Sequence, residues 1–126
     1  MSSLGDSPLV AFGQTTKVED AKAFYENVLG LEVVEDTPFA LLMRGANALL
    51  RIQKVQTFNP QPFTVLGWEV DDIAATVSKL ASRGVTFQRF DGMDQDEMGV
   101  WRSPQGSRVA WFKDPDGNLL SVSAMA

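Results

Sequence analysis

The stretch VEDAKAFYENVLGLEVV, residues 18–34, carries the pattern that decides the fold. Its apolar residues recur at spacings of three and four, which predicts an amphipathic helix. Asp20 is expected to cap the first N–H groups of this helix, and Gly30 to end it in a left-handed conformation. The apolar and polar residues that follow predict a strand over 31–36. A helix therefore leads directly into a strand at this point.

The same arrangement returns in the second half of the chain. The triplet VED at 18–20 recurs as VDD at 70–72, and a second helical pattern follows it. Asp71 or Asp72 is expected to cap this helix, and Gly84 to end it. Such a recurrence indicates two copies of one supersecondary unit.

Strand-like runs surround both helical patterns and are separated by turn-forming residues. They cover residues 9–16, 31–36, 39–44 and 48–55 in the first half, and 63–70, 85–90, 99–103, 108–113 and 119–123 in the second. Each half is interpreted as β-α-β-β-β, with repeats at about 8–57 and 62–126 of a single domain spanning 1–126. We predict an α+β fold in which the two repeats form a curved mixed sheet, with helices outside and a cavity inside.

The composition excludes several kinds of chemistry. The chain of 126 residues contains no histidine and no cysteine. Disulfides, thiolate nucleophiles, Ser-His-Asp triads and 2-His-1-carboxylate iron sites are therefore excluded. The net charge of -5 argues against a nucleic-acid partner and favours a cationic or neutral one.

Neither a membrane segment nor an export signal is evident in the sequence. No apolar run approaches the roughly 20 residues that span a bilayer. The beginning of the chain, MSSLGDSPLV, lacks a basic region followed by an apolar stretch. We expect a cytoplasmic protein that does not associate with membranes.

Three segments, in this order, resemble the vicinal oxygen chelate (VOC) superfamily, which includes glyoxalase I, bleomycin-resistance proteins and extradiol dioxygenases. They are residues 18–34, WEVDDI at 68–73, and VAWFKDPDGNLLSV at 109–122. The resemblance extends over about residues 9–123 and implies the glyoxalase/bleomycin-resistance fold. The DPDGN sequence at 114–118 is expected to form a structural turn rather than a calcium site, which needs more oxygen ligands.

The resemblance also implies where a metal would bind. Catalytic members of the superfamily hold a divalent metal with His, Gln or Glu side chains, one from each of four strands. The corresponding positions here are Gly13 with Gln14 beside it, Val65, Ser121, and Arg51 or Gln53. Glycine and valine provide no donor, a serine hydroxyl is a poor ligand and arginine repels a cation. We therefore expect neither a metal nor a cofactor.

A ligand pocket is predicted from the alternation of residues within strands. Leu50 and Ile52 should pack beneath a helix, so that Arg51 and Gln53 point into the cavity. The candidate ligand-binding residues are Arg51, Gln53, Glu69, Trp101, Trp111 and Ser121. An alternative interpretation is that Arg51 and Glu69 pair with each other or lie at exposed strand ends, and that the tryptophans only pack in the core.

Residues 91–98 carry four carboxylates and two methionines. This segment could form a weak calcium site, attract a cationic ligand, or be a solvated loop. Its length and its methionines also suit a mobile lid over the pocket.

Two function classes follow. The leading hypothesis is a metal-free, homodimeric protein that binds a small planar or cationic molecule, similar to the resistance proteins that sequester antibiotics or toxins. The alternative is a glyoxalase-like lyase or another enzyme of metal-independent mechanism, in which Glu69, Arg51 or Tyr25 acts as an acid, a base or an oxyanion partner. A metal enzyme is the third hypothesis.

Overall fold

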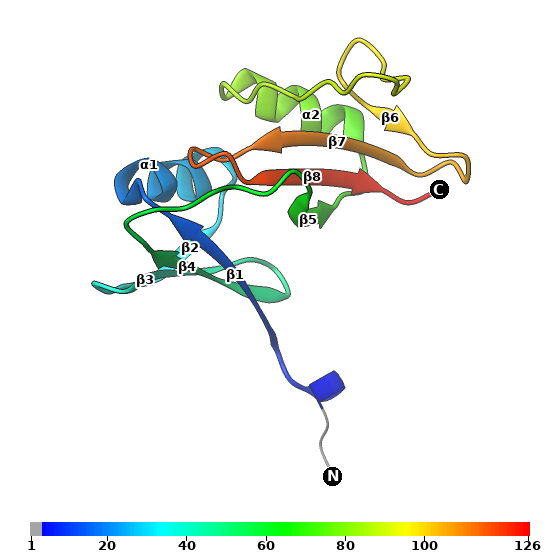
Figure 1. Cartoon of the computed structure of the whole chain (residues 1–126). Coiled ribbons are helices and arrows are strands. Elements are labelled where there is room, and N and C mark those ends of the chain that lie inside the picture. The colour runs from blue at the N-terminus through cyan, green and yellow to red at the C-terminus, as the bar shows by residue number, and fades with distance from the viewer. Residues whose placement is uncertain (1–3) are drawn as a thin grey trace. The chain divides into compact units, whose positions relative to one another are not determined.

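The computed structural model describes residues 4–126 and has an α+β fold (Figure 1). The chain divides between Asn59 and Pro60 into two compact units. Each unit contains a four-stranded mixed sheet and the element order strand, helix, three strands.

The first unit follows a short 3-10 turn, η1 (Leu4–Asp6). Its elements are β1 (Leu9–Thr15), α1 (Val18–Ala23), a π-helical turn η2 (Phe24–Val28), β2 (Glu32–Asp36), β3 (Ala40–Arg44) and β4 (Ala48–Lys54). The strand order is β1-β4-β3-β2, in which β1 and β4 are parallel and the other pairs antiparallel.

The second unit repeats this plan. Its elements are β5 (Thr64–Glu69), α2 (Ile73–Ser82), β6 (Trp101–Arg102), β7 (Arg108–Lys113) and β8 (Leu119–Ala124). The strand order is β5-β8-β7-β6, and β5 and β8 form the parallel pair.

The ends of α2 are as predicted. The Asp72 carboxylate accepts a hydrogen bond of 3.0 Å from the Ala75 backbone N–H, which satisfies one of the free donors in the first turn. Gly84 follows the helix with a φ of 95°, a left-handed conformation that glycine adopts without steric cost.

The predicted cap of the first helix is wrong. The helix begins at Val18, so Asp20 lies within its first turn, and no side chain caps it. The Asp20 carboxylate still suits this position, because the first turn of a helix is electropositive. The helix widens into the π turn before it ends, and Gly30 terminates the segment with a φ of 83°.

The strand predicted over 85–90 is also absent from the structure. This segment runs beside β7, where the Gln88 backbone N–H donates a 2.7 Å hydrogen bond to the Trp111 carbonyl. One such bond does not make a ladder, so the segment stays irregular. Likewise, only Trp101 and Arg102 of the predicted strand 99–103 pair as a strand.

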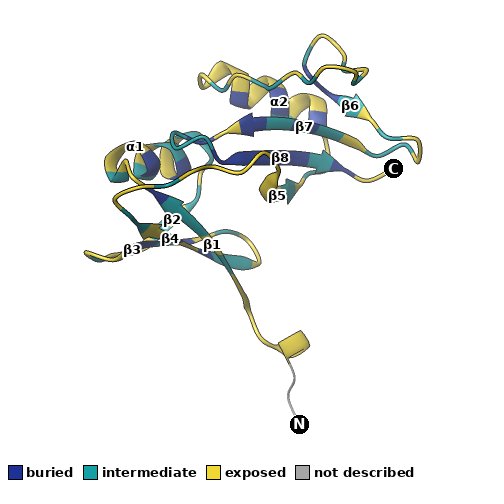
Figure 2. Ribbon diagram, in the orientation of Figure 1, coloured by how far each residue is buried: buried dark blue, intermediate teal, exposed yellow. Residues whose placement is uncertain are grey.

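Burial within β4 follows the predicted alternation. Leu50 and Ile52 are buried, whereas Arg51 and Gln53 are exposed. In the second unit, β8 is buried along most of its length (Figure 2). The core of the first unit contains Ala21, Tyr25, Ala40, Leu41, Met43, Leu50 and Ile52, and that of the second contains Ile73, Val77, Leu80, Val100, Ala110, Phe112, Leu119, Leu120, Val122 and Ala124.

The DPDGN turn between β7 and β8 has the expected structural role. The Asp114 carboxylate accepts 2.9 Å hydrogen bonds from the backbone N–H groups of Asp116 and Asn118. The Asn118 side-chain amide donates to the other carboxylate oxygen at 2.8 Å. Asp114 is buried, and both of its carboxylate oxygens accept hydrogen bonds that stabilise the turn.

Candidate functional site

Four of the six candidate residues share one face of the second sheet. Ser121 lies opposite both Gly67 and Trp111 in the strand register. The neighbouring row crosses the sheet from β5 to β6 through Glu69, Ser123, Val109 and Trp101. Directly opposed residues, and residues two apart in one strand, project from the same face. We call this surface, formed by Gly67, Glu69, Trp101, Trp111 and Ser121, the tryptophan face.

The helix α2 belongs to the opposite side of this sheet. Phe112 directly follows Trp111 in β7 and therefore projects from the other side of the sheet. Its ring meets that of Phe87 edge-on, with 5.7 Å between the centroids. Phe87 and Val77 of α2 line the same groove. The helix α2 therefore does not cover the tryptophan face.

Three aromatic rings form a wall on the tryptophan face. The centroids of Trp101 and Trp111 are 6.1 Å apart with an interplanar angle of 40°, and Phe90 meets Trp111 edge-on at 5.4 Å. The indole N–H of Trp111 donates a 3.0 Å hydrogen bond to the Thr64 hydroxyl. Trp111 is thus held in a fixed orientation. The contact between Thr64 and Trp111 could not be predicted from the sequence. The register of β5 shifts between Thr64 and Leu66, so the regular alternation of the strand does not indicate which residue lies beside Trp111.

Small residues form the floor beside this wall. A β-carbon on residue 67 would lie 2.8 Å from the Ser121 hydroxyl oxygen. Only glycine at this position therefore avoids a clash with that oxygen. Ser121 is 9% exposed, and no hydrogen bond to its hydroxyl is found within residues 4–126. A free hydroxyl that can both donate and accept therefore lies next to Trp111.

Glu69 lies at the far edge of the tryptophan face from Trp101. Three strand spacings of about 4.8 Å separate their strands, which corresponds to roughly 14 Å. The Glu69 side chain is exposed. Only an extended ligand could contact the carboxylate and both indole rings together.

Arg51 and Gln53 belong to the first unit. They project from the face of the first sheet that also carries Phe12 and Gln14, opposite the buried Leu50 and Ile52. The Gln14 side-chain amide donates to the Gln53 side-chain oxygen Oε1 at 3.5 Å.

The positions at which the resemblance implies metal ligands do not fit a divalent metal. Gly13 pairs with Ile52 and therefore lies on the face opposite to Arg51 and Gln53. Val65 lies where the register of β5 shifts, and Ser121 offers only a hydroxyl. In the part of the chain that the structure describes, no three histidine, cysteine or acidic side chains gather as a metal would require.

Tyr25, which the enzyme hypothesis used, is a core residue. It is 2% exposed, and its ring packs edge-on against Phe24 at 5.3 Å. A side chain buried in this way stabilises the first unit and is not presented to a substrate.

Hydrogen bonds from its own side chains hold the acidic segment 91–98 in place, which does not suit the mobile lid that was expected. The Gln95 side chain accepts from the Phe90 N–H at 2.8 Å and donates to the carbonyls of Gln88 at 2.9 Å and Gly99 at 2.8 Å. The Asp96 carboxylate accepts from two further backbone N–H groups in the same loop. Sequence reasoning missed Gln95, since a single glutamine gives no pattern.

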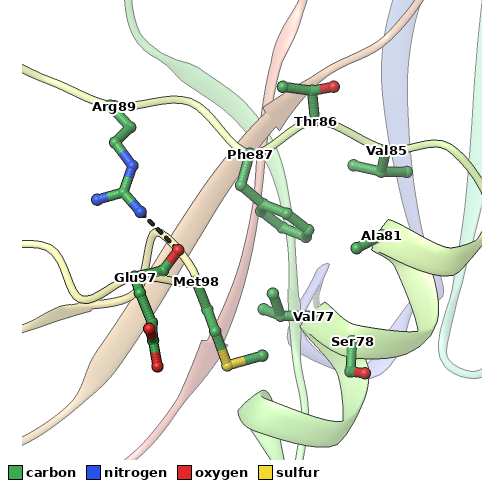
Figure 3. Close-up of a pocket in the computed structure, with 9 residues that line it drawn as sticks. All are labelled: Val77, Ser78, Ala81, Val85, Thr86, Phe87, Arg89, Glu97 and Met98. Atoms are coloured by element: carbon green, nitrogen blue, oxygen red, sulfur yellow. Dashed lines mark hydrogen bonds between the residues drawn. The ribbon is translucent and has the colours of Figure 1, made fainter.

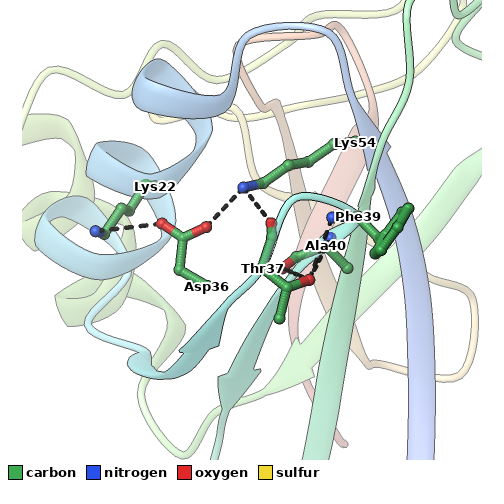
Figure 4. Close-up of polar contacts among 6 residues, drawn as sticks. All are labelled: Lys22, Asp36, Thr37, Phe39, Ala40 and Lys54. Atoms are coloured by element: carbon green, nitrogen blue, oxygen red, sulfur yellow. Dashed lines mark hydrogen bonds and ion pairs between the residues drawn. The ribbon is translucent and has the colours of Figure 1, made fainter.

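Asp36, a carboxylate of the first unit, has a shifted pKa (Figure 4). The Lys54 ammonium donates 2.6 Å hydrogen bonds to the Asp36 carboxylate and to the Thr37 carbonyl. Lys22 approaches the second Asp36 oxygen at 3.7 Å. The hydrogen bond from Lys54, and then the charges of both lysines, hold the pKa of Asp36 below its ordinary value of 3.8.

A family model described as the Glyoxalase/Bleomycin resistance protein/Dioxygenase superfamily matches residues 13–122. The chain belongs to this superfamily. The tryptophan face is therefore part of a glyoxalase-type fold, in agreement with the resemblance of residues 18–34, 68–73 and 109–122. No curated protein matches the chain.

Solved structures support the same fold. An antibiotic-binding protein from Streptomyces sp. CB03234 is 26% identical, with a TM-score of 0.72 over 96% of this chain and 97% of that one. A superfamily member from Sphaerobacter thermophilus is also 26% identical, with a TM-score of 0.72 over 93% and 95%. A lactoylglutathione lyase from Agrobacterium tumefaciens, at 16% identity, has a TM-score of 0.73 over 94% and 93% and shows the fold alone.

Membrane insertion through a helix finds no support in the structure. Among the helices of residues 4–126, none has the length and hydropathy to cross a bilayer.

Proposed function

We propose that this protein binds and sequesters a small planar organic molecule on the tryptophan face, without a metal. The observation that carries the proposal is the pair of indole rings, Trp101 and Trp111, beside the free hydroxyl of Ser121. The 26% identity to an antibiotic-binding protein over nearly the whole of both chains supports this class of ligand.

The chemistry of the face suits a flat ring system with a polar edge. Aromatic contacts contribute about 0.5–1.5 kcal/mol beyond the area they bury. The hydrogen bond from Trp111 to Thr64 orients one ring before the ligand arrives, which lowers the entropic cost of binding. Ser121 supplies a hydrogen bond beside Trp111, and an extended ligand that carries a positive charge would also reach Glu69.

Several further expectations belong to this proposal. Arg51 and Gln53 are proposed to bind ligand on the first sheet. The protein works as a cytoplasmic homodimer. The edge strand β1 supports association, because its Phe12 is 54% exposed and an edge strand has unpaired backbone groups.

A binding screen tests the proposal. Planar probes, an aminoacridine cation and a neutral coumarin, are titrated into the protein and followed by calorimetry and by thermal shift. Trp101→Ala is expected to raise the Kd of a bound probe about tenfold, which corresponds to ~1.4 kcal/mol, and Ser121→Ala to raise it less. Trp68→Phe is the matched control, because Trp68 pairs with Val122 and projects from the other face.

The absence of saturable binding of either probe would contradict the proposal, as would equal affinities of the Trp101→Ala and Trp68→Phe variants. Native mass spectrometry of freshly purified, untagged protein adds the oligomeric state, the metal content and any retained ligand in one measurement. A stoichiometric divalent metal would overturn the metal-free part of the proposal.

A further inference from the structure

A concave surface lies on the α2 side of the second unit, on the opposite side of the sheet from the tryptophan face. It is a groove of about 470 Å³ between α2 and the segment that follows it (Figure 3). Its volume lies within the range of about 300–1,000 Å³ that is usual for small-molecule sites. The groove is lined by Val77, Ser78, Ala81, Val85, Thr86, Phe87, Arg89, Glu97 and Met98.

Polar and apolar side chains line this groove in about equal measure, and the apolar part is formed around Val77, Phe87 and Met98. The Phe87 ring and the Met98 thioether lie on either side of Val77, which α2 contributes from below (Figure 3). Methionine adapts its unbranched side chain to ligands of varied shape, and its sulfur makes favourable contacts with aromatic rings. An aromatic ring or short alkyl group of a ligand could therefore bury its surface here.

The wall formed by residues 97–98 is held in place before any ligand binds. Arg89 donates a 2.7 Å hydrogen bond to the Glu97 carbonyl, and Gln95 bonds to the carbonyl of Gly99. Gly99 itself comes so close to Phe87 that an added β-carbon would lie 3.2 Å from the Phe87 β-carbon. The loop thus packs against the segment opposite, and the groove does not depend on a ligand to form it.

Of the two charged groups that line the groove, the Glu97 carboxylate is the one available to a ligand. The Arg89 guanidinium is engaged by the carbonyl oxygens of Gln95 and Glu97. The Glu97 carboxylate points away from Arg89, and within residues 4–126 it has neither a hydrogen bond nor an ion pair (Figure 3). The net charge of the whole chain, -5, acts in the same direction.

We propose that this groove is a second ligand site, which takes a small hydrophobic amine. The apolar part of the amine lies against Val77, Phe87 and Met98, and its ammonium group pairs with the Glu97 carboxylate. This site is separate from the tryptophan face and does not depend on the function proposed for that face.

Methyl NMR of methionine-labelled protein tests the second site. The probes are 4-phenylbutylamine, 4-phenylbutanol and 4-phenylbutyrate, which share an apolar tail and differ in charge. The amine is expected to shift the Met98 methyl signal saturably, with the lowest Kd of the three. Met43, buried in the core of the first unit, provides an internal control whose signal should not move. The indole N–H signals of Trp101 and Trp111 report the tryptophan face in the same spectra.

Three substitutions complete the experiment. Glu97→Gln should raise the Kd of the amine about threefold, as for a solvent-exposed ion pair, and leave that of the alcohol unchanged. Ala81→Phe should fill the groove and abolish the Met98 shift, whereas Ala75→Phe, on an exposed part of α2 outside the groove, should not. Ser78→Phe repeats the filling test if Ala81→Phe does not fold.

Two results would overturn the proposal. One is a Met98 signal that does not respond saturably to the amine, even if the indole signals do. The other is tighter binding of 4-phenylbutyrate than of the amine, since Arg89 and not Glu97 would then determine the ligand. Failure of the planar probes at the tryptophan face would leave the methionine result intact, so the two proposals fail separately.

Discussion

Gly67 and Ser121 lie in direct register on neighbouring parallel strands, and the serine hydroxyl occupies the space that a side chain at residue 67 would need. The distance from an ideal β-carbon at residue 67 to the Ser121 oxygen is 2.8 Å, shorter than such contacts are in proteins. The floor of the tryptophan face therefore depends on this glycine.

Gly67→Ala is expected to destabilise the protein by about 1–3 kcal/mol, because the added methyl group must displace the Ser121 side chain or β8. Urea denaturation measures the loss. Adding Ser121→Ala should restore most of it, since the clashing oxygen is then gone. Gly13→Ala is the control: its β-carbon would meet nothing within 4 Å, so this variant should be neutral or slightly more stable. Equal losses for both glycines would refute the argument.

Thr64→Val removes the acceptor for the Trp111 indole N–H while keeping the shape of the side chain. We expect a loss of about 0.5–1.5 kcal/mol in unfolding free energy and weaker binding of planar probes, since Trp111 is no longer held in orientation. Denaturation and calorimetry measure the two effects. Thr57→Val, at an exposed loop position, should change neither.

Asp36 predicts a pH dependence of stability. Because its pKa is lower in the folded chain than in the unfolded chain, the unfolded state binds the proton more readily in acid. The stabilisation by Asp36 is therefore fully present above its ordinary pKa of 3.8 and is lost as the pH falls through the folded value. Asp36→Asn should be less stable than the parent protein at pH 6, and the difference should shrink below pH 3.8.

Glu35→Gln provides the comparison for Asp36, because Glu35 is the exposed neighbour in β2 and projects from the other face. Its difference from the parent protein shows the effect of removing an exposed negative charge from the same strand. Added salt should weaken the Asp36 effect, since the ion pairs with Lys22 and Lys54 are partly exposed. A difference that grows in acid would contradict the assignment.

Gln95→Ala should destabilise the loop 91–99 and the whole protein by about 1–3 kcal/mol, because one N–H and two carbonyl groups lose their partner. Gln95→Glu should not rescue the loss, since a carboxylate cannot donate to the carbonyls of Gln88 and Gly99. Amide hydrogen exchange of Phe90 reports the local change. Gln105→Ala, at an exposed turn, should leave that exchange rate unchanged.

Local patterns in the sequence predict most of the secondary structure. The cap at Asp72 and the terminators Gly30 and Gly84 depend only on neighbouring residues, so their prediction succeeds. The strand predicted at 85–90 fails because its residues lie beside β7 with too few backbone bonds to form a ladder. The cap assigned to Asp20 is wrong by three positions, because the N-cap of the helix is Lys17.

It is harder to predict which face of a sheet a side chain projects from than to predict that a segment forms a strand. Counting back from the first helix assigns Gly13 to the ligand face, but its partner Ile52 is a core residue. An error of one residue reverses the face, because side chains alternate with a period of two. The parity of β4 is predicted correctly from its buried Leu50 and Ile52. The irregular register at Thr64 and the bonds of Gln95 arise from tertiary contacts that no local pattern encodes.

Residues of the segment 85–90 contact both faces of the second sheet. Phe87 lines the groove beside α2, Phe90 meets Trp111, and Gln88 between them bonds to the Trp111 backbone. Residues that share partners in this way usually show non-additive mutational effects. The energetic effects of substituting Phe87 and Trp111 should therefore not add up, and a double-mutant cycle would measure how strongly one side of the sheet depends on the other.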